Sequence, residues 1–143
     1  MRRGLLAVAL GISFLILMTW LGTIVANIVP HRATAQMQSA QVGPYSVTLQ
    51  VNPNPPFITQ PATLSVQVLF SASQQPVTGA TVVLESNMET MDMGTERAPA
   101  PDQGKGIYRA SVQFSMSGFW KVQVLISRPG TPPARAAFYV TAQ

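Results

Sequence analysis

The sequence predicts an all-β fold, an immunoglobulin-like β-sandwich of six to seven strands, preceded by one N-terminal transmembrane or signal helix. Three observations indicate this. Apolar and polar residues alternate in several short runs after residue 36, turn-forming residues separate the runs, and one long apolar stretch lies within the first 35 residues. We therefore expect a membrane anchor or signal peptide at 1–35, a small polar linker at 36–43 and the sandwich domain at 44–143.

The N-terminal apolar stretch extends from Gly4 to Val29 without a charged residue. As a helix it would span roughly 39 Å, whereas a bilayer core measures about 30 Å and a signal-peptide core usually has about 7–15 residues. Its length favours a retained anchor, which would make the protein single-pass in the cell membrane. The sequence Ala33-Thr34-Ala35 matches a signal-peptidase site, so secretion after cleavage at Ala35 is the alternative. In both cases Arg2 and Arg3 keep the N-terminus in the cytoplasm and the domain lies outside, periplasmic or on the cell surface.

The alternating runs after residue 43 predict the strands one by one. They comprise Tyr45 to Val51, Leu64 to Phe70, Ala80 to Leu84, Tyr108 to Phe114, Trp120 to Ile126 and Phe138 to Val140. Large apolar side chains on alternating strands usually face the core, so we expect Phe70, Phe114, Trp120 and Phe138 to be buried. A pair of cysteines around a tryptophan, the mark of an antibody-type domain, is absent from the sequence.

Charge and composition argue against several functions. The chain has nine Lys and Arg and five Asp and Glu, but after residue 35 the balance is only six against five, so we expect no nucleic-acid partner. It has no Cys and one His, His31, which precedes the domain. Thiol catalysis, zinc fingers and a serine activated by histidine within the domain are therefore excluded. We expect neither an enzyme nor a small-molecule substrate.

A methionine-rich segment is the part of the sequence that indicates chemistry. Between Leu84 and Pro101 the alternation breaks, and Met88, Met91 and Met93 fall within six residues. Met116 follows the Phe114 strand. Thioether sulfur is a soft ligand that selects soft ions, chiefly Cu(I). We therefore predict a Cu(I) site formed by Met88, Met91, Met93 and Met116. The hard oxygens of Glu89 and Asp92 would not ligate the ion directly.

Two alternatives use the same segment without copper. Methionine also forms adaptable apolar contacts, so the domain would then be a structural protein–protein interaction module whose Met-rich loop touches a partner. A calcium loop built from Glu89, Asp92 and Glu96 around Gly94 is the other alternative, although the spacing does not fit an EF-hand.

Several motifs together resemble those of YtkA-like domains and the related FixH-like proteins. They are Pro76-Val77-Thr78-Gly79-Ala80-Thr81-Val82, Met91-Asp92-Met93-Gly94, Gly106-Ile107-Tyr108 and Phe114-Ser115-Met116-Ser117-Gly118-Phe119-Trp120-Lys121-Val122. The resemblance covers roughly residues 44–142.

This resemblance implies an extracytoplasmic immunoglobulin-like domain behind a membrane segment, and copper handling. FixH-like proteins are tied to the assembly of copper-containing respiratory oxidases, so a membrane complex of that kind is the implied partner. Met91, Met93 and Met116 match the family pattern, with Met88 as an addition. Gly118 and Trp120 match as well, and we interpret them as a turn and a core anchor. Because the domain has no His, a site here would favour Cu(I) over Cu(II).

Overall fold

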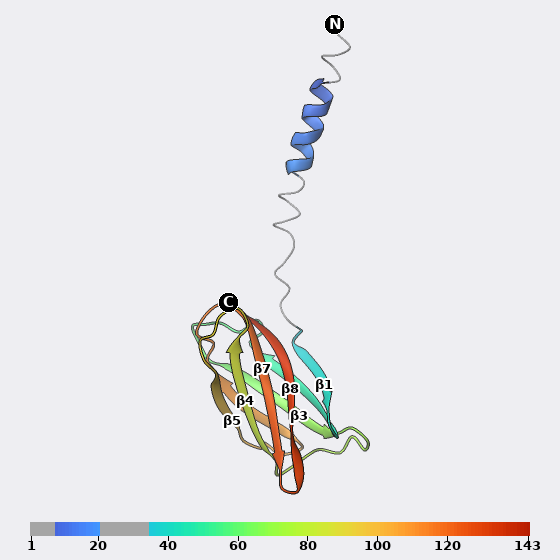
Figure 1. Cartoon of the computed structure of the whole chain (residues 1–143), viewed down its shortest axis with the longest axis vertical. Coiled ribbons are helices and arrows are strands. Elements are labelled where there is room, and N and C mark those ends of the chain that lie inside the picture. Colours follow the sequence, from blue (N-terminus) through green and yellow to red (C-terminus); the bar gives the residue numbers. More distant parts are fainter. Residues whose placement is uncertain (1–7, 21–34) are drawn as a thin grey trace. The chain divides into compact units, whose positions relative to one another are not determined.

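The computed structural model describes residues 8–20 and 35–143 (Figure 1). The chain divides into two compact units, Met1–Arg32 and Ala33–Gln143. In the first unit, residues 8–20 form an α-helix. Within the described ranges, no helix has both the length and the apolar character needed to cross a membrane. Much of the predicted anchor, and all but the last residue of the predicted cleavage motif, lie outside these ranges.

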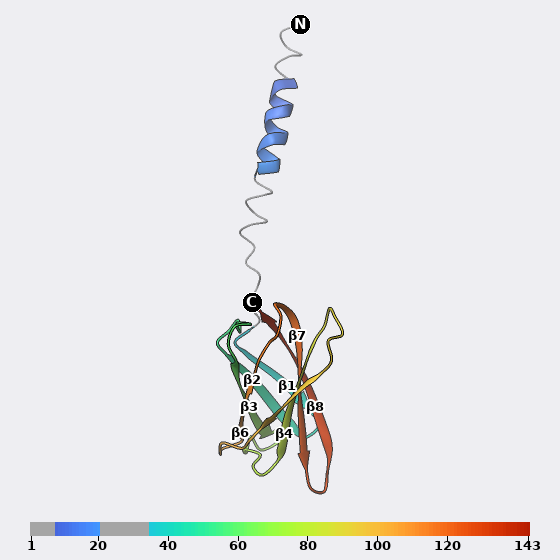
Figure 2. The same ribbon diagram turned by 90° about the vertical axis from the view of Figure 1, so that its left-hand side faces the viewer.

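The second unit is a β-sandwich, as the alternation predicts. Two antiparallel four-stranded sheets have the strand orders β1-β2-β3-β6 and β5-β4-β7-β8 (Figures 1 and 2). The strands are β1 (Met37–Val42), β2 (Tyr45–Asn52), β3 (Ala62–Phe70), β4 (Thr81–Met88), β5 (Glu96–Ala100), β6 (Ile107–Val112), β7 (Gly118–Arg128) and β8 (Thr131–Ala142).

Two of these eight strands correct the sequence prediction. The segment 36–43, expected to be a linker, contains β1, which pairs with β2 from Met37 opposite Gln50 to Val42 opposite Tyr45. β5 lies within the segment expected to be irregular and pairs with β4. Both are edge strands, and neither carries an alternating row of large apolar side chains. These two segments are strands because they hydrogen-bond to a longer neighbouring strand. An apolar pattern in the sequence does not reveal such pairing.

The core between the sheets consists of the side chains that face inward on the predicted alternating strands. Phe114, Trp120 and Phe138 are buried as expected. The rings of Phe114 and Trp120 meet edge to face, 5.4 Å apart. Phe70 is only partly buried, because it lies at the end of β3, where Arg128 covers its ring with the guanidinium 5.2 Å from the centroid.

A buried tyrosine fixes the connection between β3 and β4. The Tyr108 hydroxyl donates a hydrogen bond to the carbonyl of Val77 (2.8 Å) and accepts one from the amide of Ala80 (3.3 Å). The Asp102 carboxylate accepts a hydrogen bond from the amide of Gly79 (3.1 Å). The motif around residues 76–82 is thus explained by the contacts that hold this connection against β6.

The strand directions gather three loops at one end of the sandwich. β4 ends at Met88 opposite Trp120, near the start of β7, and β8 ends opposite Gly118. The loops 53–61, 89–95 and 113–117 therefore lie at the same end as the C-terminus, which Figure 2 shows. We call this the Met-loop end, because three of the four predicted ligands are in these loops and the fourth, Met88, directly precedes one of them.

Candidate metal site

The segment 89–95 is the loop that joins β4 to β5, and its described hydrogen bonds lie near its two ends. The amide of Glu89 donates to the carbonyl of Phe119 (3.0 Å), which fastens the loop to β7. The amide of Gly94 donates to Oδ1 of Asp92 (3.2 Å), and Gly94 adopts φ +83°, a conformation that favours glycine. The middle of the loop, including Met91, is exposed.

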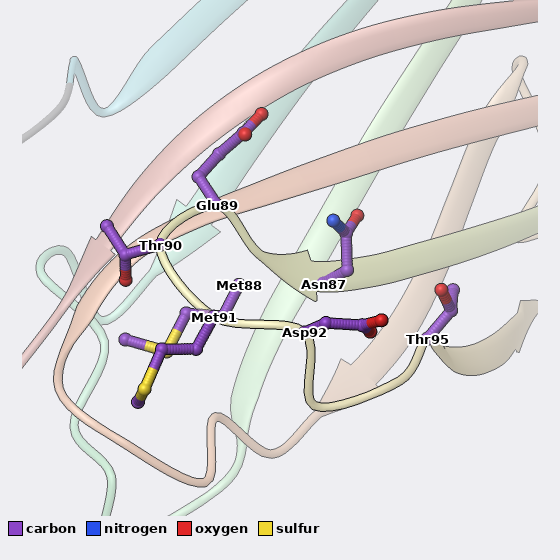
Figure 3. Close-up of a pocket in the computed structure, with 7 residues that line it drawn as sticks. All are labelled: Asn87, Met88, Glu89, Thr90, Met91, Asp92 and Thr95. Atoms are coloured by element: carbon purple, nitrogen blue, oxygen red, sulfur yellow. The ribbon is translucent and has the colours of Figure 1, made fainter.

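Two of the four predicted ligands line one surface pocket of about 250 Å³. Met88 approaches from the end of β4 and Met91 from the loop, and Figure 3 shows both side chains extending to the same side. The pocket is lined by Asn87, Met88, Glu89, Thr90, Met91, Asp92 and Thr95. The structure therefore brings two of the four predicted ligand residues to one pocket, with their side chains on the same side of the loop.

The other two predicted ligands lie outside this pocket. Met93 lines a neighbouring pocket of about 350 Å³ together with Trp120, and Thr95 borders both pockets. Met116 lines neither, and its carbonyl accepts a hydrogen bond from the Trp120 indole (3.0 Å). Met93 and Met116 are both exposed, so their thioethers are open to solvent.

Met88 differs from the three other methionines because it is also part of the core, with only 8% of its surface exposed. The sequence interpretation placed it in a polar loop, but it ends β4 on the inward side of the alternation. Its burial gives the candidate site one donor fixed by the fold, while Met91 belongs to the exposed loop. Gly118 and Trp120, interpreted from sequence as a turn and a core anchor, begin β7 directly beside Met88, and Trp120 is buried.

The carboxylates around the pocket have partners of their own. Nζ of Lys121 lies 4.0 Å from Oε1 of Glu89, and Asp92 holds the amide of Gly94. In the described parts of the chain, no three His, Cys, Asp or Glu side chains are grouped so that they could hold a metal ion. Glu89, Asp92 and Glu96, the residues of the calcium alternative, therefore do not form such a group in this structure.

Sequence reasoning did not identify the uncharged polar residues that line the two pockets. Asn87, Thr90 and Thr95 border the first pocket, and Ser86 and Ser115 border the second. The sequence prediction ended this strand at Leu84. Extending it to Met88 would have identified Asn87, because the side chain of Asn87 alternates with that of the inward-facing Met88. Ser86 is also on β4, whereas Thr90, Thr95 and Ser115 lie in the β4–β5 and β6–β7 connections, which carry no periodic signal.

The fold and the loop define an eight-stranded β-sandwich with a methionine-lined pocket at one end. Residues 39–125, more than half of the chain, match the YtkA-like family, and the chain belongs to that family. The crystal structure of a DUF4426 family protein from Pseudomonas aeruginosa PAO1 is similar in fold, with a TM-score of 0.51 at 14% identity, covering 74% of this chain and 94% of that chain. No match was found among curated proteins.

Proposed function

We propose that this protein is an extracytoplasmic Cu(I)-binding protein that carries the ion or passes it to a membrane complex. The observation that carries the proposal is the shared pocket of Met88 and Met91. Membership of the YtkA-like family supports it, and so does the resemblance of its motifs to those of FixH-like proteins, which are tied to the assembly of copper-containing respiratory oxidases.

The donors of this pocket suit a soft monovalent ion. Two thioethers supply soft ligands that have no proton to lose, so their affinity for Cu(I) does not depend on deprotonation. The hard oxygens of Glu89 and Asp92 already have Lys121 and the Gly94 amide as partners. Met93, two residues after Met91 on the exposed loop, is the nearest further donor in the sequence, and Met116 is the fourth.

The remaining parts of the proposal concern location and activity. The apolar N-terminal stretch would hold the protein in the cell membrane as a single-pass anchor, with the sandwich outside the cytoplasm. The acceptor would be a membrane complex such as a respiratory oxidase. The protein would have no catalytic activity of its own, because its serines and carboxylates have no histidine or cysteine in the domain to act with them.

Competition for Cu(I) tests the site. The purified full chain is titrated anaerobically with Cu(I) against a chromophoric chelator, and the Met88→Leu/Met91→Leu variant is compared with it. Leucine keeps the apolar bulk and removes the sulfur, so we expect one equivalent bound by the parent and at least about a tenfold weaker affinity in the variant. Met37→Leu is the matched control, because Met37 is exposed on β1, in the other sheet from β4 and β5, and lines neither Met pocket. Equal affinity in parent and double variant would exclude this site.

The same variants separate copper binding from a purely structural role. A protein–protein interaction module would use the methionines as apolar contacts, for which leucine is a close substitute. Partner capture that persists in the double variant, with no Cu(I) bound by the parent, would favour the interaction module.

A further inference from the structure

The exposed large apolar side chains of the sandwich are concentrated at the Met-loop end. They are Met37, Phe57, Ile58, Met91, Met93, Met116, Phe119 and Tyr139. Five belong to the loops 53–61, 89–95 and 113–117, and Met37 and Phe119 are the first and second residues of their strands. The connections at the opposite end, 43–44, 71–80, 101–106 and 129–130, contribute none.

Hydrogen bonds fix the backbone of the loop 53–61, which carries part of this apolar surface. The amide of Ile58 donates to the carbonyl of Gln143 (2.9 Å), and the amide of Gln143 donates to the carbonyl of Pro56 (2.9 Å). The Gln113 side chain donates to the carbonyl of Ile58 (2.7 Å). Phe57 and Ile58 nevertheless keep about two-fifths of their surface exposed. The backbone of this loop is thus fixed while part of each apolar side chain stays open to solvent, where a binding partner could cover it.

Two aromatic rings extend this surface along the outer face of the second sheet. Phe119 on β7 and Tyr139 on β8 stack with their ring planes parallel and their centroids 5.3 Å apart. Both are exposed. The phenol of Tyr139 gives the pair an apolar body with one polar tip, the combination that is enriched at membrane interfaces.

The predicted membrane segment joins the sandwich at this same end. The carbonyl of Gln36, one residue before β1, accepts a hydrogen bond from the amide of Val51 near the end of β2. The apolar stretch ends at Val29, so only residues 30–36 connect it to β1. Seven residues reach at most about 25 Å. An anchor of this kind would keep the Met-loop end close to the bilayer.

We propose that the Met-loop end docks on the lipid bilayer beside the chain's own membrane segment, with Phe57, Ile58 and the methionines of the loops entering the interface. The inference rests on the anchor of the proposed function but is independent of copper. Lipid fits this surface better than a protein partner, because the apolar side chains protrude from separate loops. At this end the acidic Glu89 and Asp92 are accompanied by one lysine, Lys121, which pairs with Glu89, so the attraction is apolar and requires no anionic lipid.

Site-directed spin labelling of the full chain tests the docking. The chain has no cysteine, so Thr90→Cys at the Met-loop end and Thr78→Cys at the opposite end each give one labelling site on an exposed threonine. Each protein is reconstituted in vesicles of zwitterionic phosphatidylcholine, and collision rates are measured with oxygen and with a water-soluble nickel chelate. We expect the oxygen-to-nickel ratio at residue 90 to exceed that at residue 78 by at least about threefold.

The outcomes separate this inference from the anchor and from copper. Vesicle flotation reports the anchor, and chelator competition reports Cu(I). Chains that float but give equal ratios at residues 90 and 78 would overturn the docking while the anchor stands, and would leave the surface for a protein partner. Chains that do not float would overturn both. The Phe57→Ser/Ile58→Ser change is expected to lower the ratio at residue 90 to about half or less, and an unchanged ratio would also overturn the inference.

Discussion

The terminal methyl group of Met88 occupies the space that a side chain at Gly118 would need. A Cβ atom added to Gly118 would lie 2.5 Å from Cε of Met88. Gly118 also adopts φ +141°, a conformation that side chains rarely permit. The glycine that begins β7 therefore allows Met88, on the neighbouring strand β4, to be both a core residue and a lining residue of the pocket.

Replacing Gly118 with alanine tests this relationship. The Gly118→Ala change should lower the free energy of unfolding by about 1–3 kcal/mol, because the added methyl displaces Met88 as well as straining the backbone. Urea denaturation measures it. Gly130→Ala is the matched control, since Gly130 also has a positive φ (75°) but no atom near its would-be Cβ. Equal costs at both positions would mean that strain alone acts and that the contact with Met88 is unimportant.

The four methionines should differ in their importance for Cu(I). Met91 shares the pocket with Met88, whereas Met116 lines neither pocket. We expect Met91→Leu to weaken Cu(I) binding by about tenfold or more and Met116→Leu by less than about threefold, because Met91 lines the same pocket as Met88 and Met116 does not. Single-variant titrations with the same chelator give the ranking. The reverse order would move the site from the β4–β5 loop to the Trp120 side of the sandwich.

The sandwich was predictable where burial imposes a period of two. The alternation from Tyr45 to Val51 and from Trp120 to Ile126 identified β2 and most of β7, because one face of each strand is covered. β1 escaped prediction because its residues alternate only between exposed and half-buried. The register shift near the β7–β8 turn, between Ile126 and Arg128, also has no counterpart in the apolar pattern.

The candidate site was predictable in its residue types but not in its geometry. The spacing of Met88, Met91 and Met93 indicated a sulfur-rich loop. It did not reveal that β4 continues to Met88, which turns that residue into the core, or that Met91 and Met93 line different pockets. Those features depend on the pairing of Met88 opposite Trp120 and on the path of the loop between two strands. Local sequence does not specify such long-range contacts.

A nearly buried carboxylate on the outer face of the second sheet gives a further prediction. The Glu85 side chain is only 7% exposed, with Nη2 of Arg97 2.5 Å from one oxygen and Nη2 of Arg135 4.0 Å from the other. Removing one cation leaves a poorly solvated charge with a weaker partner. Since Arg97 is 71% exposed and therefore screened by solvent, we expect Arg97→Gln to cost only about 1 kcal/mol.

Thermal or urea unfolding of Arg97→Gln and Arg135→Gln checks this. The loss should be smaller for Arg135→Gln, whose partner lies farther away, and added salt should reduce the difference. In a Glu85→Gln background the two arginine changes should lower the free energy of unfolding by nearly the same amount. An Arg97→Gln effect that persists in that background would mean that the ion pair does not contribute to stability.

Tyr108 links the stability of the sandwich to alkaline pH. Burial raises the pKa of its phenol above the ordinary value, and the nearby Asp102 carboxylate adds to the increase, while the hydrogen bond from the amide of Ala80 opposes it. The folded protein therefore holds this proton more tightly than the unfolded chain does. Its contribution to stability is complete below the ordinary tyrosine pKa of about 10 and is lost as the pH rises through the raised pKa.

The Tyr108→Phe variant should show both effects of the hydroxyl. At neutral pH it loses the hydrogen bonds to Val77 and Ala80, so the free energy of unfolding should fall by about 1–3 kcal/mol. Above pH 10 its stability should decline less steeply than that of the parent, because the variant lacks the phenol with the raised pKa. Urea unfolding at several pH values from 7 to 11 measures both, with Tyr139→Phe as the control on an exposed tyrosine. Parallel pH profiles for the parent and Tyr108→Phe would show that another group governs alkaline unfolding.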